Sequence, residues 1–226
     1  MAGPRGLVIA IDGVIGSGKS TAARGVAQAL SYRHLDTGAM YRAVALRATA
    51  RDLRPDDHDG LVLLLKSLQI ELTPLDEGGR ILVDGEDVSD AIRLPEITRC
   101  VGSYADRPEV RERLVEHQRS LGAEGGVVAE GRDMSSVVFP QADLKIKMLA
   151  DLEERAHRRH LEYIARGIDI SLEQVRVDIQ TRDQEDEQRD YGADGLPLDI
   201  VEVSTDGLDA AAVTARIVEL ARERGA

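Results

Sequence analysis

The 226-residue sequence contains no tryptophan and no asparagine, and it has one phenylalanine, one cysteine and four lysines. The single cysteine, Cys100, excludes an intrachain disulfide and is typical of a protein kept in a reducing compartment. We interpret it as a buried structural residue rather than a catalytic nucleophile. GTPase-type switches read guanine with an Asn-Lys-x-Asp motif, which a chain without asparagine cannot form. These absences exclude a disulfide-stabilised scaffold and that class of GTPase.

Long hydrophobic runs and excess positive charge are also lacking. No apolar run approaches the length of a membrane span, and the mean hydropathy is −0.24. The run that starts at Leu7 ends at Asp12, too soon for a signal peptide. The net charge is −12, whereas binding to a DNA or RNA polymer requires a basic surface. We therefore expect a cytoplasmic protein without a nucleic-acid or membrane partner.

The cations that are present are mostly arginines, because only four of the 29 Lys and Arg residues are lysines. The planar guanidinium of arginine suits bidentate recognition of phosphate. Small phosphorylated ligands are therefore compatible with this acidic chain if several arginines converge on one site.

Residues 13–20 read Gly-Val-Ile-Gly-Ser-Gly-Lys-Ser, the G-x-x-x-x-G-K-S signature of a phosphate-binding loop. An apolar run over 7–12 predicts a strand before it, and apolar residues at helical spacing over 22–30 predict a helix after it. Lys19 would reach the β- and γ-phosphates of a nucleotide, and the Ser20 hydroxyl would ligate Mg²⁺. The predicted phosphate-binding residues are Gly13, Gly16, Ser17, Gly18, Lys19, Ser20 and Thr21.

The remaining pattern predicts an α/β fold, with a parallel sheet of about five strands and helices on both of its faces. Predicted strands at 33–36, 127–130, 144–149 and 199–203 alternate with helices, and 137–140 is a further apolar stretch. The predicted N-caps include Asp36, for the helix that begins near Ala39, and Asp106, for a helix that begins near Pro108. Residues 52–104 break this alternation. A helix over 57–68 precedes a β-hairpin formed by 70–73 and 80–83. This texture predicts an inserted α+β module.

Charged residues continue an apolar stripe on a predicted helix over 172–189. The apolar members are Leu172, Val175 and Ile179. The same face continues with Arg182, Asp186 and Arg189. One interpretation is a solvated helix end with an Arg182–Asp186 ion pair worth about 0.3–0.5 kcal/mol. The other is a helix end that offers two guanidinium groups to a phosphate or a ribose, and the phosphate-binding loop favours it.

Six segments, taken together in their order and spacing, resemble the bacterial cytidylate kinase family. They are Asp36–Arg42, Gly85–Ser89, Glu130–Met134, Val137–Pro140, Glu154–Arg159 and Arg182-Asp183-x-x-Asp186-x-x-Arg189. The resemblance spans residues 7–205. It implies transfer of phosphate from ATP to CMP or dCMP, assisted by Mg²⁺. The sequence departs from the family at Val14 and Ile15, where Pro-Ser or Pro-Ala is usual, and at Ser135, where glycine is usual.

The resemblance also implies roles for individual residues. The residues matching the CMP site are Thr37, Tyr41, Arg42, Ser103, Arg111, Gly131, Arg132, Asp133, Arg182, Asp186 and Arg189. Within this set, Ser103, Arg111 and Asp133 would read the cytosine. Arg182 and Asp186 would hold the sugar, and Arg42, Arg132 and Arg189 the phosphate. The predicted catalytic cations are Lys19, Arg132 and Arg189, with Arg155 and Arg159 closing from a lid.

The family resemblance further implies three parts. These are a core of residues 1–36, 105–154 and 192–226, an NMP-binding module of residues 37–104, and a helical lid of residues 155–191. We expect a monomer, because nothing in the sequence demands an oligomer. Two alternatives stay open. One is another P-loop kinase of a small acceptor, such as a deoxynucleoside or thymidylate kinase. The other is a catalytically inactive nucleotide-binding module.

Overall fold

The computed structural model describes residues 6–188 and 197–226. They form two compact units, residues 6–32 with 126–188 and 197–226, and residues 33–125, and each unit is described by itself. Arg189, one of the predicted site residues, lies outside the described residues, as does the segment 190–196.

The larger sheet has the strand order β2-β6-β1-β7-β8. These strands are Arg33–Asp36, Val127–Gly131, Val8–Gly13, Leu144–Leu149 and Val201–Ser204. Strand β1 pairs in parallel with β6 and with β7, and β7 pairs in parallel with β8. Ile9, Ala10 and Ile11 of β1 are fully buried, as expected of a central strand covered on both faces. The five-stranded α/β fold that the sequence predicts is confirmed.

Helices α1 (Lys19–Leu30) and α8 (Ala210–Arg222) pack against each other in the first unit. In α1 the buried residues are Ala22, Ala23, Val26 and Ala27, a narrow stripe of small side chains. The small side chains allow a close approach of the two helices. Gly25 of α1 is the closest point, because a Cβ atom there would lie 2.7 Å from Thr214 Oγ1 of α8.

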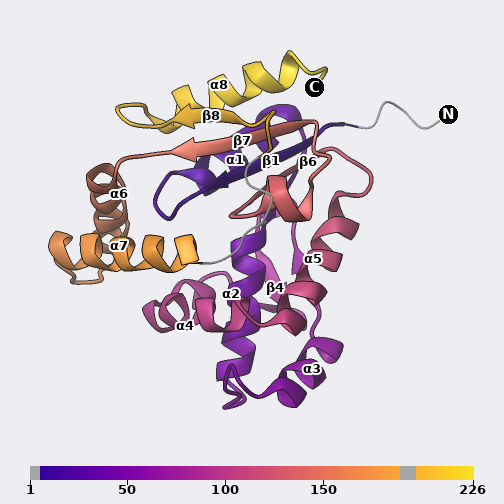
Figure 1. Ribbon diagram of the computed structural model, residues 1–226, viewed down its shortest axis with the longest axis vertical. Coiled ribbons are helices and arrows are strands. Elements are labelled where there is room, and N and C mark those ends of the chain that lie inside the picture. Colours follow the sequence, from indigo (N-terminus) through magenta and orange to yellow (C-terminus); the bar gives the residue numbers. More distant parts are fainter. Residues whose placement is uncertain (1–5, 189–196) are drawn as a thin grey trace. The chain divides into compact units, whose positions relative to one another are not determined.

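Helices α6 (Leu152–Ala165) and α7 (Leu172–Gln188) follow β7 and pack together beyond its C-terminal end (Figure 1). Their own core is small, and it consists of Ala156, Val175 and Ile179. Ile15, from the loop after β1, packs against this cluster. The phosphate-binding loop therefore contributes an apolar side chain to the core of the α6–α7 pair.

The segment after β6 forms a π-helical turn, η3 (Met134–Val138), which the sequence analysis treats only as an apolar stretch. The carbonyl oxygen of Asp133 accepts hydrogen bonds from the amides of Val137 and Val138, at 2.9 and 3.0 Å. The Phe139 amide donates to the Met134 carbonyl at 2.7 Å, which closes the wider turn. Single π turns often occur at functional sites.

The second unit is built around α2 (Thr37–Thr49), which packs against α3 (His58–Ser67), α4 (Pro95–Ala105) and α5 (Pro108–Gly122). Seven residues of α2 are buried, and they lie on most of its circumference. A helix that is buried nearly all round belongs in the middle of its unit. The Asp36 side chain caps α2 by accepting the Ala39 amide at 2.8 Å, as the sequence predicts.

The predicted hairpin of the second unit is present and has a third strand. Strands β3 (Ile70–Leu72), β4 (Ile81–Val83) and β5 (Glu86–Asp87) form an antiparallel sheet. The turns η1 (Leu75–Glu77) and η2 (Ala91–Arg93) accompany it. Asp84 and Gly85 join β4 to β5 with φ angles of 53° and 81°. Positive φ at both positions is the signature of a tight hairpin turn, and Asp84-Gly85 directly follows the end of β4 at Val83.

One correction concerns the start of α5. Asp106 was predicted as the N-cap of α5. The capping position is instead Arg107, and no side chain caps the helix there. Asp106 instead closes the preceding helix, because its amide donates to the Gly102 carbonyl of α4 at 3.0 Å. Pro108 at the first helical position removes one of the amides that a cap would satisfy.

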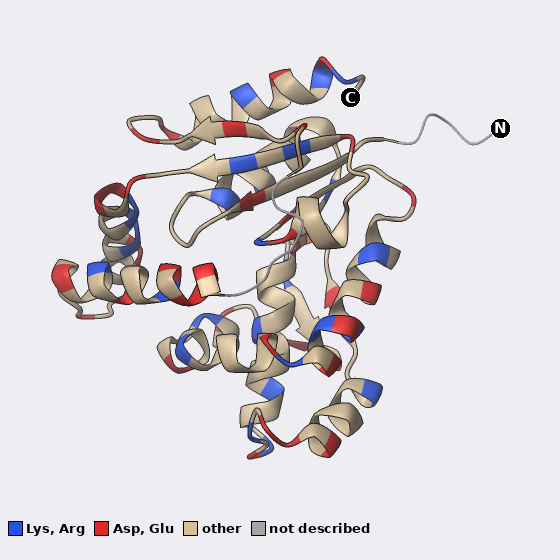
Figure 2. Ribbon diagram, in the orientation of Figure 1, with Lys and Arg blue, Asp and Glu red and all other residues tan. Residues whose placement is uncertain are grey.

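Charged residues are spread over the helices of both units (Figure 2). Acidic and basic positions alternate along α6 and α7, which carry several ion pairs within a single helix. Among the helices in the described part of the chain, none has the length and apolar character needed to cross a bilayer.

We expect Gly25→Ala to destabilise the protein by about 1–3 kcal/mol, because the added methyl group would overlap Thr214. Helix propensity alone predicts the opposite sign, a gain of about 1 kcal/mol. Urea unfolding of the single variant and of Gly25→Ala/Thr214→Ala measures the difference. The second change removes the obstructing atoms and should restore most of the lost stability. A single variant more stable than the parent would contradict the close approach of α1 and α8.

Candidate functional site

The phosphate-binding loop runs from Gly13 at the end of β1 to the start of α1. Gly16 and Gly18 have φ angles of 76° and 85°, which residues with a side chain rarely adopt. Gly13 also has no room for a side chain, since a Cβ there would lie 2.8 Å from the Met148 carbonyl oxygen. The loop and the N-terminus of α1 therefore form the strand–loop–helix arrangement that binds a polyphosphate.

Lys19 lies in the first turn of α1 and bends back over the loop. Its Nζ atom donates a hydrogen bond to the Val14 carbonyl at 2.7 Å. Burial, and the positive charge of Arg132 nearby, lower the pKa of Lys19 to about 7. A phosphate anion would restore the protonated form, because it supplies the negative charge that the buried ammonium group lacks.

Ser20 donates a hydrogen bond to the Glu130 carboxylate, with 2.7 Å between Oγ and Oε2. Glu130 is buried at the C-terminal end of β6, the strand next to β1. Glu130 begins one of the six segments that carry the family resemblance, but it was not among the predicted site residues. The signal that could have identified it is an acidic residue at the end of a strand that flanks the phosphate-binding loop.

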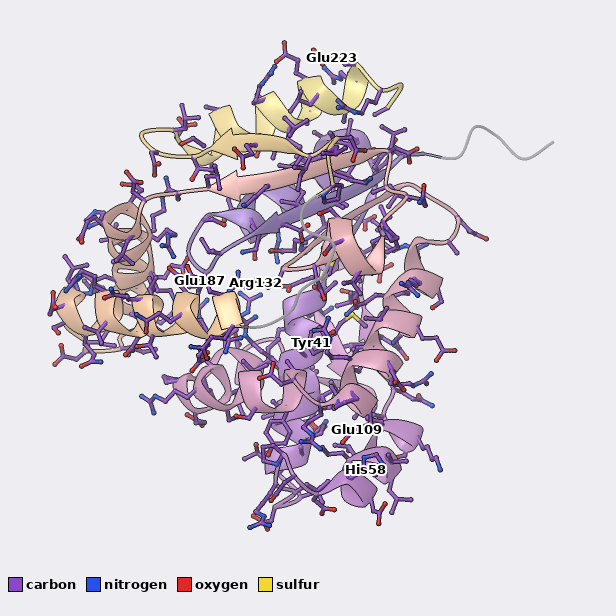
Figure 3. The ribbon with its side chains drawn as sticks, in the orientation of Figure 1. Tyr41, His58, Glu109, Arg132, Glu187 and Glu223 are labelled. Carbon is purple, nitrogen blue, oxygen red and sulfur yellow. The ribbon has the colours of Figure 1, made fainter. Side chains whose placement is uncertain are left out.

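Arg132 connects the phosphate-binding loop to α7. Its Nη1 atom donates to the Gly13 carbonyl, and its Nε atom lies 2.7 Å from Asp186 Oδ2. Figure 3 shows Arg132 beside the C-terminal end of α7. The predicted Arg182–Asp186 ion pair is present at 3.3 Å. Asp186 is only 7% exposed, so the charged end of the α7 stripe is not a solvated surface.

Arg155 and Arg159 of α6 lie in different surroundings. Arg155 is buried and donates to the Ile15 carbonyl of the phosphate-binding loop at 3.3 Å. Its guanidinium group also pairs with Asp183 of α7, with 2.7 Å between Nη2 and Oδ2. Arg159 pairs instead with Glu162 at 2.7 Å and lies 4.7 Å from the centre of the Tyr163 ring. The structure thus brings Arg155, but not Arg159, into contact with the loop.

Three successive carbonyl oxygens of the loop therefore accept hydrogen bonds from cations. Gly13 accepts from Arg132, Val14 from Lys19 and Ile15 from Arg155. Cations held around a phosphate-binding loop can neutralise the charge on a phosphoryl group during its transfer.

Gly131 and Asp133 flank Arg132 at the end of β6. Gly131 lies opposite Asp12 in the parallel pairing of β6 with β1. Asp133 is 4% exposed. Asp12 is also buried, and burial raises the pKa of its carboxyl, although hydrogen bonds from Ser135 and Met134 oppose that rise. The sequence analysis did not propose a role for Asp12.

Thr205, between β8 and α8, connects Arg158 of α6 to the phosphate-binding loop. The Arg158 guanidinium group donates to the Thr205 hydroxyl at 2.9 Å and to the Thr205 carbonyl at 2.7 Å. The Thr205 hydroxyl in turn donates to the Ser17 carbonyl at 3.3 Å. Neither Arg158 nor Thr205 was predicted as a site residue, and no local pattern in the sequence marks Thr205. Thr21, which was predicted, is exposed in the first turn of α1.

The other predicted acceptor residues belong to the second unit. Thr37, Tyr41 and Arg42 lie at the start of α2, and Tyr41 is labelled there in Figure 3. Thr37 is buried, whereas Tyr41 and Arg42 are partly exposed. Ser103 is exposed near the end of α4, and Arg111 is partly exposed in the first turns of α5.

Comparison with known proteins gives a match over almost the whole chain. The family model described as "Cytidylate kinase" matches residues 9–223. The chain is 44% identical over 216 residues to a protein named cytidylate kinase from Geobacillus sp. (strain WCH70), covering 96% of each chain. It is 41% identical to a cytidylate kinase from Geobacter sulfurreducens, covering 99% of this chain and 96% of the relative.

Solved structures with similar folds have much lower sequence identity. An uncharacterised protein from Eubacterium ventriosum ATCC 27560 superposes with a TM-score of 0.51 at 12% identity. The superposition covers 96% of this chain and 98% of the other. At this identity the likeness concerns the fold alone.

We expect binding of a nucleoside triphosphate to take up about one proton per site at pH 8 and almost none at pH 6. In the free protein Lys19, with a pKa of about 7, is mostly neutral at pH 8, and the bound triphosphate would recharge it. Calorimetric titration in two buffers with different ionisation enthalpies measures this uptake. Lys19→Arg, whose cation stays charged at both pH values, is the control and should take up no proton. Equal uptake by both proteins at pH 8 would contradict the lowered pKa.

Proposed function

Because the chain belongs to the cytidylate kinase family, we propose that it transfers the γ-phosphoryl group of ATP to CMP, giving ADP and CDP. dCMP would be accepted as well. The observation that carries the proposal is the attachment of Arg132 to the phosphate-binding loop, next to the buried carboxylate of Asp133. This arrangement supports the proposal, because Arg132 could bind the acceptor phosphate beside the loop that would hold ATP, and the neighbouring Asp133 could read the base.

The donor side of the reaction would use the phosphate-binding loop. Backbone amides of Gly13, Gly16, Ser17, Gly18, Lys19, Ser20 and Thr21 would surround the ATP phosphates. The Lys19 ammonium group would exchange the Val14 carbonyl for phosphate oxygens. Arg155, which already contacts the loop, would add positive charge from α6. We keep Arg159 as a second candidate of the same kind, although its present partners are Glu162 and Tyr163.

The oxygen atoms around Ser20 fit a magnesium ion. Mg²⁺ prefers oxygen ligands and usually combines one or two protein groups with substrate phosphates and water. The Ser20 hydroxyl and the Glu130 carboxylate offer such oxygens beside the phosphate-binding loop. When bound, the ion would neutralise charge on the phosphates of ATP. We therefore propose Glu130 as a second metal ligand beside the predicted ligand Ser20.

The acceptor would be recognised by its base, sugar and phosphate. Cytosine carries an amino group at N4 and acceptors at O2 and N3, so the Asp133 carboxylate suits the amino group. Ser103 and Arg111 would donate to the two acceptors. Arg182 and Asp186, which pair on one face of α7, would hold the ribose.

The CMP phosphate would meet Arg132, with Arg42 and Arg189 as its further partners. Thr37, Tyr41 and Gly131 complete the proposed set. The acceptor oxygen is already an anion, so the chain needs no strong general base. Positioning and charge neutralisation would therefore supply most of the catalysis.

We further propose that residues 37–104 act as the NMP-binding module, residues 155–191 as a lid, and the remaining residues as the core. The protein would act as a monomer in the cytoplasm. Ion pairs of α7 with Arg132 and Arg155 support the lid assignment, because they give α7 a direct connection to phosphate-binding cations.

An acceptor screen tests the function. ADP release from ATP should be fast with CMP and dCMP and slow with nucleosides and with TMP. Lys19→Ala should reduce turnover of CMP by about two orders of magnitude or more, because it removes charge stabilisation in the transition state. Circular dichroism would check that the variant is folded. Fast turnover of a nucleoside, or near-normal activity of Lys19→Ala, would overturn the proposal.

A second experiment tests the role of Asp133. Uracil has a carbonyl where cytosine has its amino group, so UMP would leave the carboxylate without a partner at a cost of about 1–3 kcal/mol. We expect kcat/KM to favour CMP over UMP by about 5- to 150-fold, and Asp133→Asn to reduce this preference. Asp143→Asn is the matched control, because the Asp143 carboxylate accepts the Val8 amide at 2.8 Å but lies outside the proposed site. An unchanged CMP preference in Asp133→Asn would show that another residue reads the base.

A further inference from the structure

Asp12, the penultimate residue of β1, holds the segment that follows β6. Its Oδ1 atom accepts the Met134 amide at 2.7 Å. Its Oδ2 atom accepts the Ser135 amide at 2.9 Å and also the Ser135 hydroxyl. Both oxygens of one carboxylate are therefore used to hold two consecutive residues, which lie 122 and 123 positions further along the chain.

The next residue of β1 is attached to the same segment. The Gly13 carbonyl accepts a hydrogen bond from Arg132 Nη1. In the sheet, Asp12 lies opposite Gly131. The residues from 131 to 135, here called the acceptor loop, are thus fixed at both ends by two consecutive residues of β1. Gly13 is also the first residue of the phosphate-binding loop, so one short stretch of chain fixes both loops.

We propose that Asp12 and Ser135 form a positioning pair that sets the place of the acceptor loop relative to the phosphate-binding loop. The proposal rests on the proposed function for the roles of Arg132 and Asp133. Because Asp12 is 4% and Ser135 0% exposed, neither side chain is available to a substrate. They act through the two residues that precede Met134.

Phosphoryl transfer is sensitive to such positioning, because the acceptor oxygen must lie in line with the bond that breaks. A misplacement of about 1 Å can reduce a rate by about 100-fold. The three hydrogen bonds to Met134 and Ser135 fix the position of the Asp12 carboxylate. The Ser135 hydroxyl is the one that can be removed without touching the backbone, so it gives the cleanest test.

The experiment measures steady-state kinetics of Ser135→Ala with ATP and CMP, well below its melting temperature. We expect kcat to fall about tenfold, while both KM values change less than about twofold, because a displaced acceptor loop affects alignment more than binding. Hydrolysis of ATP without CMP should be unchanged, since the phosphate-binding loop is intact. The ratio of CDP formed to ATP consumed should therefore fall.

Further variants separate positioning from stability. Ser120→Ala is the matched control, because the Ser120 hydroxyl donates to the His117 carbonyl of α5 at 2.7 Å and Ser120 is not among the proposed site residues. It should leave kcat unchanged. Asp12→Asn puts an amide donor against backbone donors and should lower kcat further than Ser135→Ala. The double variant should be no slower than Asp12→Asn, because both changes disturb one interaction. If Asp12→Asn does not fold, the comparison of Ser135→Ala with Ser120→Ala decides.

A normal kcat in Ser135→Ala, with or without a lower melting temperature, would overturn the positioning role. Additive effects of Asp12→Asn and Ser135→Ala on kcat would also overturn it. Failure of the proposed function gives a different result, because the parent protein would then show no fast CMP-dependent release of ADP, or Lys19→Ala would keep near-normal turnover.

Discussion

The phosphate-binding loop holds cations on its carbonyl oxygens as well as offering amides to an anion. The carbonyls of three successive residues, Gly13, Val14 and Ile15, accept from Arg132, Lys19 and Arg155. Like charges so close together repel each other, and burial, together with the charge of Arg132, lowers the pKa of Lys19. Each of the three cations has a carbonyl partner, which offsets part of this repulsion. The other contacts of the site depend on this arrangement.

Helix α7 supplies the balancing negative charge. Asp183 and Asp186, three residues apart and on neighbouring positions of one helix face, pair with Arg155 and Arg132. Ile15 adds an apolar contact, since it packs against the Ala156–Val175–Ile179 cluster between α6 and α7. Ile15 is also one of the two loop positions at which the sequence is expected to depart from the family's usual residues. The side chain of Ile15 packs on the α6–α7 core and its carbonyl oxygen accepts from Arg155, so this residue attaches the loop to both helices.

The strand–loop–helix start and the parallel sheet could be predicted from the sequence because their signals are local. A glycine-rich loop between an apolar run and a helical stripe needs no information from elsewhere in the chain. Strand β5 was missed because two residues carry no periodicity, although the Asp84-Gly85 turn before it is a recognisable signal. The prediction of Asp106 as the N-cap of α5 was wrong because Pro108 allows a helix to start without a side-chain cap.

The residues missed at the site have partners far away in the sequence. Glu130 meets Ser20 across 110 positions, Asp12 meets Met134 across 122, and Thr205 meets Ser17 across 188. Spacing along one helix or strand cannot reveal such pairs, because the sheet order brings them together. The Arg182–Asp186 pair was predictable for the opposite reason, since its partners are four residues apart on one helix. The burial of Asp186 was not predictable, because its second partner, Arg132, is distant in the sequence.

The buried charges of this site also bear on what a phosphate ligand must do. Arg132 pairs with a carboxylate that is 7% exposed, and Arg155 is itself 6% exposed. Removing one partner from such a pair leaves a buried charge without compensation, which is strongly destabilising. A phosphate oxygen can replace a carboxylate or a carbonyl as the partner of a guanidinium group without that cost, because it brings negative charge and acceptor oxygens to the same position. The ion pairs therefore hold Arg132 and Arg155 in position. An anionic ligand would replace Asp186 or Asp183 as the partner of these guanidinium groups more readily than a neutral ligand would.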